Sequence, residues 1–271
     1  MTTSKLENPM HAAARRELWF ESDGARLFAL DVGQGEPVVF LHGGLADHRA
    51  ALFRVGELAS TCRLVCPDLR ASGRSIHDGP LSWDRLADDV AALLGRLGVE
   101  RAIVGGTSMG SAVALRFALR HPSLLRGLIL MSPVYPGADR PLAEAARMAM
   151  QTMGETAERV RAQGIEALRP PFENLPAPVR DVALEMMVGF DAGSVAATTR
   201  FLAASEQPMS SVSELEAIDV PVLILPGLDA QHPREIASLY AQRLRHAVSV
   251  EQTDAAMLAT MARFCNAPSS S

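Results

Sequence analysis

Residues 102–110 read AIVGGTSMG, an apolar run that ends in glycines and leads into a helical sequence. A serine with glycine two residues to either side is typical of a sharp strand-to-helix turn, because a larger residue at either glycine would collide with the neighbouring strand or helix. Such a turn raises the Ser108 hydroxyl to the carboxyl end of the sheet, where open α/β folds bind ligands. The pattern predicts a nucleophile at Ser108, and the alternative is a purely structural turn.

Short β-rich runs alternate with helical segments on both sides of this turn. The alternation predicts an α/β fold with a mostly parallel sheet and helices on both faces. Eight strands are expected, at residues 18–21, 26–32, 38–42, 63–66, 102–105, 127–131, 220–225 and 247–250. The main helices of the core are expected at residues 81–97, 109–120 and 233–244. Ser22-Asp23-Gly24 predicts a hairpin between the first two strands, at the edge of the sheet.

A long helical segment separates the sixth expected strand from the seventh. A connection of this length within a compact domain is typical of a lid or an inserted subdomain. We therefore expect a helical cap at residues 134–218, inserted into a single core made of residues 17–133 and 219–265. Residues 1–16 and 266–271 are polar with little periodicity, which predicts flexible tails.

Methionines are frequent in the expected cap. They either fill its core or line an adaptable apolar substrate pocket. The residues concerned are Met148, Met150, Met153, Met186, Met187 and Met209.

The composition is that of an ordinary globular protein, with 48% hydrophobic and 21% charged residues among 271. A net charge of −5 and scattered arginines argue against nucleic acid as a partner. Neither a secretory signal nor eighteen consecutive apolar residues occur, so we expect a cytoplasmic protein with no membrane partner. Cys62, Cys66 and Cys265 read as reduced, buried thiols, and no zinc-ligand spacing predicts a metal site.

Two further motifs directly follow expected strands. FLHGGLAD at residues 40–47 carries a glycine pair that lets backbone amides approach a ligand, and PDLRASGRS at residues 67–75 follows the next strand. Together with the serine turn, and in this order, they resemble the motifs of the α/β-hydrolase superfamily over about residues 17–265. In that resemblance Asp68 and Arg70 organise their loop through internal hydrogen bonds. The chain departs from the pattern at Ala71, where many relatives carry glycine.

The resemblance also implies roles at the site. Ser108 is then the nucleophile, and the amides of Gly44 and Met109 form the oxyanion hole. Leu45 and His42 are expected at the substrate-binding surface, where His42 organises its loop rather than acting in catalysis. Chemistry of this kind requires no metal, nucleotide or organic cofactor.

An acidic residue is expected after the seventh strand. The run VLILPGLD at residues 222–229 places Asp229 just past the strand end, where a carboxylate could orient a catalytic histidine. An aspartate just ahead of a helix is also a common cap or turn residue. Both readings of Asp229 remain open.

The catalytic histidine is absent from the place where the superfamily usually carries it, after the eighth strand, where residues 248–256 read VSVEQTDAA. Downstream of the serine, His121 falls at a helix end and His246 opens the last strand away from the site. His232 lies on the correct rim. It is either the general base or a surface residue ahead of a helix begun by Pro233.

The sequence thus predicts a serine hydrolase that cleaves an ester, thioester, lactone or similar acyl bond of a small apolar substrate through an acyl-enzyme. Within the same fold, a lyase, a cofactor-free peroxidase or a carbon–carbon bond hydrolase is the alternative. A non-catalytic binding protein is the alternative from another class, favoured by the missing C-terminal histidine. An apolar cap surface could also pair two copies into a homodimer.

Overall fold

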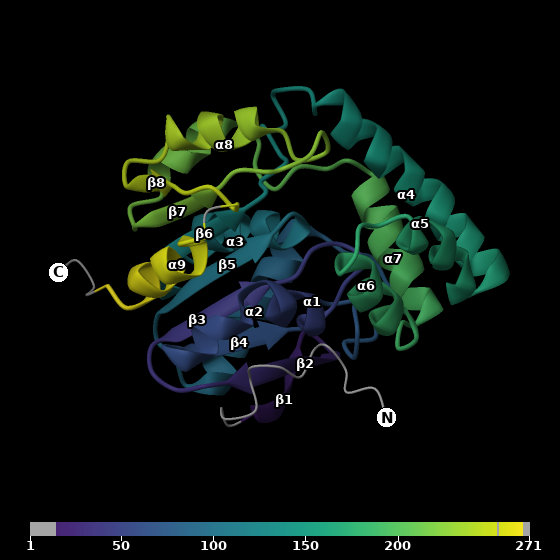
Figure 1. The fold of residues 1–271 in the computed structure, drawn as a ribbon, viewed down its shortest axis with the longest axis horizontal. Coiled ribbons are helices and arrows are strands. Elements are labelled where there is room, and N and C mark those ends of the chain that lie inside the picture. The colour runs from purple at the N-terminus through teal and green to yellow at the C-terminus, as the bar shows by residue number, and fades with distance from the viewer. Residues whose placement is uncertain (1–14, 254, 268–271) are drawn as a thin grey trace.

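A computed structural model describes residues 15–253 and 255–267 of the chain. The tails predicted at either end fall largely outside these residues. The described chain forms the predicted eight-stranded sheet with helices on both faces (Figure 1). Its strand order is β1-β2-β4-β3-β5-β6-β7-β8.

All eight expected strands are present. They are β1 (Arg15–Ser22), β2 (Ala25–Val32), β3 (Pro37–Leu41), β4 (Arg63–Pro67), β5 (Ala102–Thr107), β6 (Leu125–Met131), β7 (Val222–Leu225) and β8 (Ala247–Ser249). β2 runs antiparallel to both β1 and β4, and every other pairing is parallel. The expected hairpin joins β1 to β2, with Asp23 and Gly24 both at positive φ.

Alternate residues of each central strand face the two helical layers, as the period of two in a strand requires. In β3, Val39 and Leu41 belong to an apolar cluster that also includes residues of α2 (Trp83–Leu97), α3 (Met109–Arg120) and α8 (Arg234–Ala241). Val38 and Phe40, on the opposite face, belong to a second apolar cluster that includes residues of α1 (His48–Val55) and α9 (Met257–Cys265). The parallel strands are therefore buried on both sides.

Helices α1 and α9 were not expected from the sequence, and α8 begins one residue later than expected. Asp47 caps α1 by accepting a hydrogen bond from the amide of Arg49. Pro233 has an extended ψ of 136°, so it precedes α8 rather than beginning it. Short 3-10 turns also occur, namely η1 (Gly56–Ser60), η2 (Pro122–Leu124), η3 (Ile165–Leu168) and η4 (Val212–Ala217).

Four helices are inserted between β6 and β7, where no strand was expected. They are α4 (Glu144–Gln163), α5 (Arg169–Glu173), α6 (Val179–Met187) and α7 (Ala192–Ala203). Figure 1 shows them gathered at one side of the sheet, with α4 beside α7. These inserted helices have an apolar cluster of their own, to which Val160, Phe172 and Met187 belong. The cap boundaries at 134–218 remain a prediction from the sequence.

The three cysteines and the apolarity of the helices were also considered from the sequence. Cys62, Cys66 and Cys265 are buried and form no disulfide, as expected. Within the described residues, no helix combines the length and apolarity that crossing a bilayer requires.

A buried ion pair ties the loop after β4 to α2. Arg70 donates to both carboxylate oxygens of Asp89, at 2.9 and 2.7 Å, and to the carbonyl oxygen of Ser22 at 2.8 Å. The two side chains are 2% and 6% exposed. Arg70 therefore organises its loop, as the resemblance implied.

Arg70→Leu should lower the free energy of unfolding by about 3–5 kcal/mol, because it leaves a carboxylate buried without its partner. Urea denaturation measures the loss. The double variant Arg70→Leu/Asp89→Leu should recover most of it, since it removes both charges. Equal losses in the single and double variants would contradict this assignment.

Candidate active site

The serine turn has the strained geometry that its glycines predicted. Ser108 joins β5 to α3 at φ 53° and ψ −116°, a left-handed conformation that non-glycine residues rarely adopt. A Cβ on Gly106 would lie 2.5 Å from the backbone of Gly110 and 2.8 Å from the carbonyl oxygen of Leu41. A Cβ on Gly110 would lie 2.5 Å from the carbonyl oxygen of His42. Both positions therefore require glycine.

A continuous hydrogen-bond chain leads from Ser108 to Asp229. The Nε2 atom of His232 lies 2.9 Å from Ser108 Oγ, and its Nδ1 lies 2.8 Å from Oδ1 and 3.1 Å from Oδ2 of Asp229. In a neutral imidazole, Nδ1–H then donates to the carboxylate and Nε2 accepts from the serine hydroxyl. The loop between β7 and α8 therefore folds inward over Ser108, which is the arrangement that a general base at His232 would require.

Asp229 holds both the backbone and the ring of His232. Its Oδ1 accepts the amides of Gln231 at 2.9 Å and of His232 at 3.0 Å, which is the turn role anticipated for an aspartate here. Partial burial acts to raise the pKa of Asp229, but the hydrogen bond and charge of His232 outweigh it and hold that pKa below its usual value. The two readings of Asp229, as turn residue and as partner of a histidine, thus coexist.

Gly227 lies beneath this turn. A Cβ there would overlap the carbonyl oxygen of His232 and come within 2.5 Å of its Cβ. The tight path that brings the imidazole back to Ser108 is open only to glycine at this position.

A cavity of about 210 Å³ opens beside Ser108. Gly44 and Met109, the residues expected to supply the oxyanion hole, both line it. The rest of the lining is mostly apolar and comes from the segment after β6, from α4, from α7 and from the β7–α8 loop: Val134, Tyr135, Ala146, Ala149, Met150, Met153, Leu202, Gln231 and His232.

Sequence reasoning identified only part of this lining. Of the methionines singled out, Met150 and Met153 reach the cavity, whereas Met148 is exposed and Met187 packs inside the inserted helices. The missed signal was periodicity, because the α4 residues that line the cavity fall at i, i+3, i+4 and i+7, one face of a helix. They are Ala146, Ala149, Met150 and Met153.

His42 does not line this cavity, which corrects its expected place at the substrate-binding surface. It is completely buried. Its Nε2 accepts the amide of Leu69 at 3.0 Å, so Nδ1 carries the proton and donates to the carbonyl of Gly43 at 2.7 Å. Burial lowers the pKa of His42, against the opposing effect of the Asp68 carboxylate, and keeps the ring neutral. With both nitrogens engaged, His42 organises its loop.

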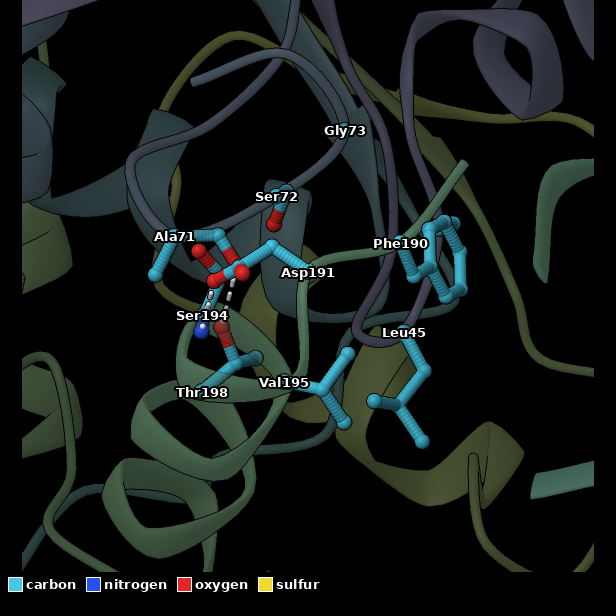
Figure 2. Close-up of a pocket in the computed structure, with 10 residues that line it drawn as sticks. Leu45, Ala71, Ser72, Gly73, Phe190, Asp191, Ser194, Val195 and Thr198 are labelled. Atoms are coloured by element: carbon cyan, nitrogen blue, oxygen red, sulfur yellow. Dashed lines mark hydrogen bonds between the residues drawn. The ribbon is translucent and has the colours of Figure 1, made fainter. Parts of the chain in front are cut away.

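Leu45, which was also expected at the substrate-binding surface, does not line the cavity at Ser108. Its φ of 53° belongs to the left-handed region. Figure 2 shows its side chain beside Phe190 and Val195, at a separate hollow between its own loop, the loop at residues 71–73 and α7. That hollow measures about 10 Å³, room for roughly one water molecule. Leu45 therefore contacts the inserted helices rather than the cavity at Ser108.

Asp47, His48 and Asp68 bring three potential ligand atoms within 4.8 Å of one another. Asp68, however, accepts bonds from the amide and ring of His48 and from the amide of Arg74, and Asp47 is paired with Arg49. Burial acts to raise the pKa of Asp68, but its bond to His48 outweighs this and lowers it. The cluster thus works as an internal network that organises the loop, as expected for Asp68.

The other two histidines downstream of Ser108 have partners elsewhere. His121 ends α3 and lies 2.7 Å from Asp88. His246 precedes β8 and lies 3.2 Å from Asp219. Neither lines the cavity at Ser108.

Known proteins share this architecture. A family described as the alpha/beta hydrolase fold matches residues 36–177. The AB hydrolase superfamily protein YisY of Bacillus subtilis (strain 168) is 33% identical over 211 residues, 74% of this chain and 76% of that protein. The 2-hydroxymuconate semialdehyde hydrolase of Pseudomonas sp. (strain CF600) is 31% identical over 126 residues, 45% of this chain and 44% of that enzyme.

A solved structure extends the likeness over most of the chain. The thermophilic esterase from Thermogutta terrifontis superposes with a TM-score of 0.70 at 28% sequence identity. The superposition covers 88% of this chain and 89% of the esterase.

Proposed function

Because this chain belongs to the alpha/beta hydrolase family, we propose that it is a serine hydrolase that cleaves an ester, thioester or lactone of a small, uncharged acyl group. The observation that carries the proposal is the hydrogen-bond chain from Ser108 through His232 to Asp229, with distances of 2.9 and 2.8 Å. This is the arrangement that activates a serine hydroxyl towards a carbonyl carbon. The esterase neighbour is consistent with it.

The proposed reaction proceeds in two stages. Ser108 Oγ attacks the carbonyl carbon while His232 Nε2 takes its proton, and the resulting oxyanion is held by the amides of Gly44 and Met109. His232 then protonates the leaving group, which departs and leaves an acyl-enzyme. Water, deprotonated by the same imidazole, releases the acyl group as a carboxylic acid and restores Ser108. Asp229 stabilises the imidazolium in both stages.

The lining of the cavity supports an uncharged acyl group. Apart from His232, none of the described side chains that line it carries a titratable charge near neutral pH. A carboxylate on the acyl chain would therefore lie against a mostly apolar lining without a cation, which is costly to the extent that it loses water. The relative named for 2-hydroxymuconate semialdehyde takes a substrate whose name denotes a carboxylate, so its substrate is not the best match for this cavity.

An activated ester whose acyl chain ends in a carboxylate should be hydrolysed at least ~10²-fold less efficiently, in kcat/KM, than the neutral ester of the same length. Steady-state kinetics on the matched pair measures the ratio. Equal efficiencies would contradict the uncharged-substrate proposal while leaving the serine mechanism intact.

A fluorophosphonate probe tests the proposed nucleophile directly. The native protein should be labelled at a single site, and Ser108→Ala should not be labelled. Failure to label the native protein would favour a non-catalytic binding protein. The binding-protein alternative was favoured by the missing histidine after the eighth strand. His232, from the loop between β7 and α8, places an imidazole within hydrogen-bond distance of Ser108 instead.

A further inference from the structure

We propose that Gln252 is a positioning residue that holds His232 against Ser108, a role that rests on the function proposed above. Gln252 follows β8, in the segment where the superfamily usually carries its catalytic histidine. It does not line the cavity, and its side-chain hydrogen bonds go to Ser132, Pro226 and Arg54. Any effect on the reaction must therefore pass through the segments that Gln252 holds, at the ends of β6 and β7.

The side-chain amide of Gln252 joins three strand ends. Its Nε2 donates to the carbonyl oxygen of Pro226 at 2.7 Å and to Ser132 Oγ at 2.8 Å. Pro226 is the first residue after β7, and Ser132 is the first after β6. Gln252 thus holds Pro226, the first residue of the loop between β7 and α8 that carries Asp229 and His232. Both N–H donors of its side-chain amide are used in these bonds.

A second contact holds the far end of the same turn. Arg234, at the start of α8, pairs with both carboxylate oxygens of Glu251, at 2.8 and 2.5 Å. This pair is exposed, and exposed ion pairs contribute little to stability. The partly buried bonds of Gln252 are therefore the more important of the two contacts.

The outer part of the loop between β7 and α8 is exposed to solvent. Residues 228–231 are all exposed, and the Leu228 side chain lies in solvent rather than in the core. Asp229 and His232 are bonded to each other within the turn, so they can move together without losing their own contact. The 2.9 Å contact between His232 and Ser108, by contrast, depends on where the turn lies relative to α3. Loss of the Gln252 bonds should therefore misplace an intact acid–base pair, and small displacements are costly for proton transfer.

Gln252→Met keeps the length of the side chain and removes both donors. We expect kcat per active site, counted by burst titration, to fall by about 10–100-fold while KM changes less than about threefold. The matched control is Arg54→Met, because Arg54 contacts only the carbonyl oxygen of the same amide, at 3.4 Å, and leaves both donors in place. Its kcat per site should stay within about twofold of the native value. A lower titre with native kcat per site would assign Gln252 a merely structural role and overturn the proposal.

Nuclear magnetic resonance of the histidine rings tests the same claim without turnover, with the His232 signals identified by their loss in His232→Gln. In Gln252→Met these signals should shift or broaden, whereas in Arg54→Met they should not. Unchanged His232 signals in Gln252→Met would overturn the proposal. If the native protein is not labelled by fluorophosphonate but Gln252→Met still displaces the His232 signals, the hydrolase function fails and the positioning role stands.

Discussion

Ser108→Ala and His232→Ala should each lower kcat on a short activated ester by about 10²–10⁴-fold or more, and the double variant should lose no more than the worse single one. The reason is that the two side chains act as one unit. Without the imidazole, the serine hydroxyl keeps its proton and is a poor nucleophile, and without the serine the imidazole has no proton to take. Non-additive losses in the two-by-two set of variants are the signature of this coupling.

His246→Ala is the matched control for the histidine. His246 also pairs with an aspartate, Asp219, but it lies before β8 and is exposed. Its removal should leave kcat and KM at native values. Native turnover in His232→Ala, or strictly multiplicative losses in the double variant, would show that the general base is another group.

The position of the base illustrates what could be read from the chain alone. Asp229 and His232 were both identifiable because they lie three residues apart on one stretch that follows a clear strand. Whether that stretch turns inward could not be read, because the answer depends on side-chain contacts with segments distant in sequence. The contact between His232 and Ser108 spans 124 residues, and that between Gln252 and Ser132 spans 120.

The sheet was more predictable than the cavity. Strands such as β3 and β7 are continuous apolar runs bounded by turn residues, and such runs are largely determined by local sequence. The cavity depends on how α4 and α7 lie over the sheet, which local sequence does not specify. Leu45 was misplaced for a similar reason, since a positive φ at a non-glycine residue directs its side chain to α7.

Gly227→Ala should lower kcat per active site by about 10²-fold or more, approaching the effect of removing the imidazole. The added methyl group would overlap the carbonyl oxygen of His232 and come within 2.5 Å of its Cβ, both rigid parts of the turn. The turn must open to relieve this overlap, and opening carries the imidazole away from Ser108. Burst titration followed by steady-state kinetics measures the loss per site.

Gly95→Ala is the matched control, because it adds the same methyl group at a position where no other atom lies close to it. Gly95 lies within α2, and a Cβ there has no neighbour within 4 Å. Because alanine is favoured over glycine inside helices by roughly 0.5–1 kcal/mol, this variant should be slightly more stable and fully active. Native kcat in Gly227→Ala would mean that the imidazole does not depend on the path of this turn. A loss of kcat in Gly227→Ala, with none in Gly95→Ala, would show that the position of His232 depends on the glycine five residues before it. In this turn, Asp229 and His232 can lie three residues apart and both reach their partners because the residue beneath them has no side chain.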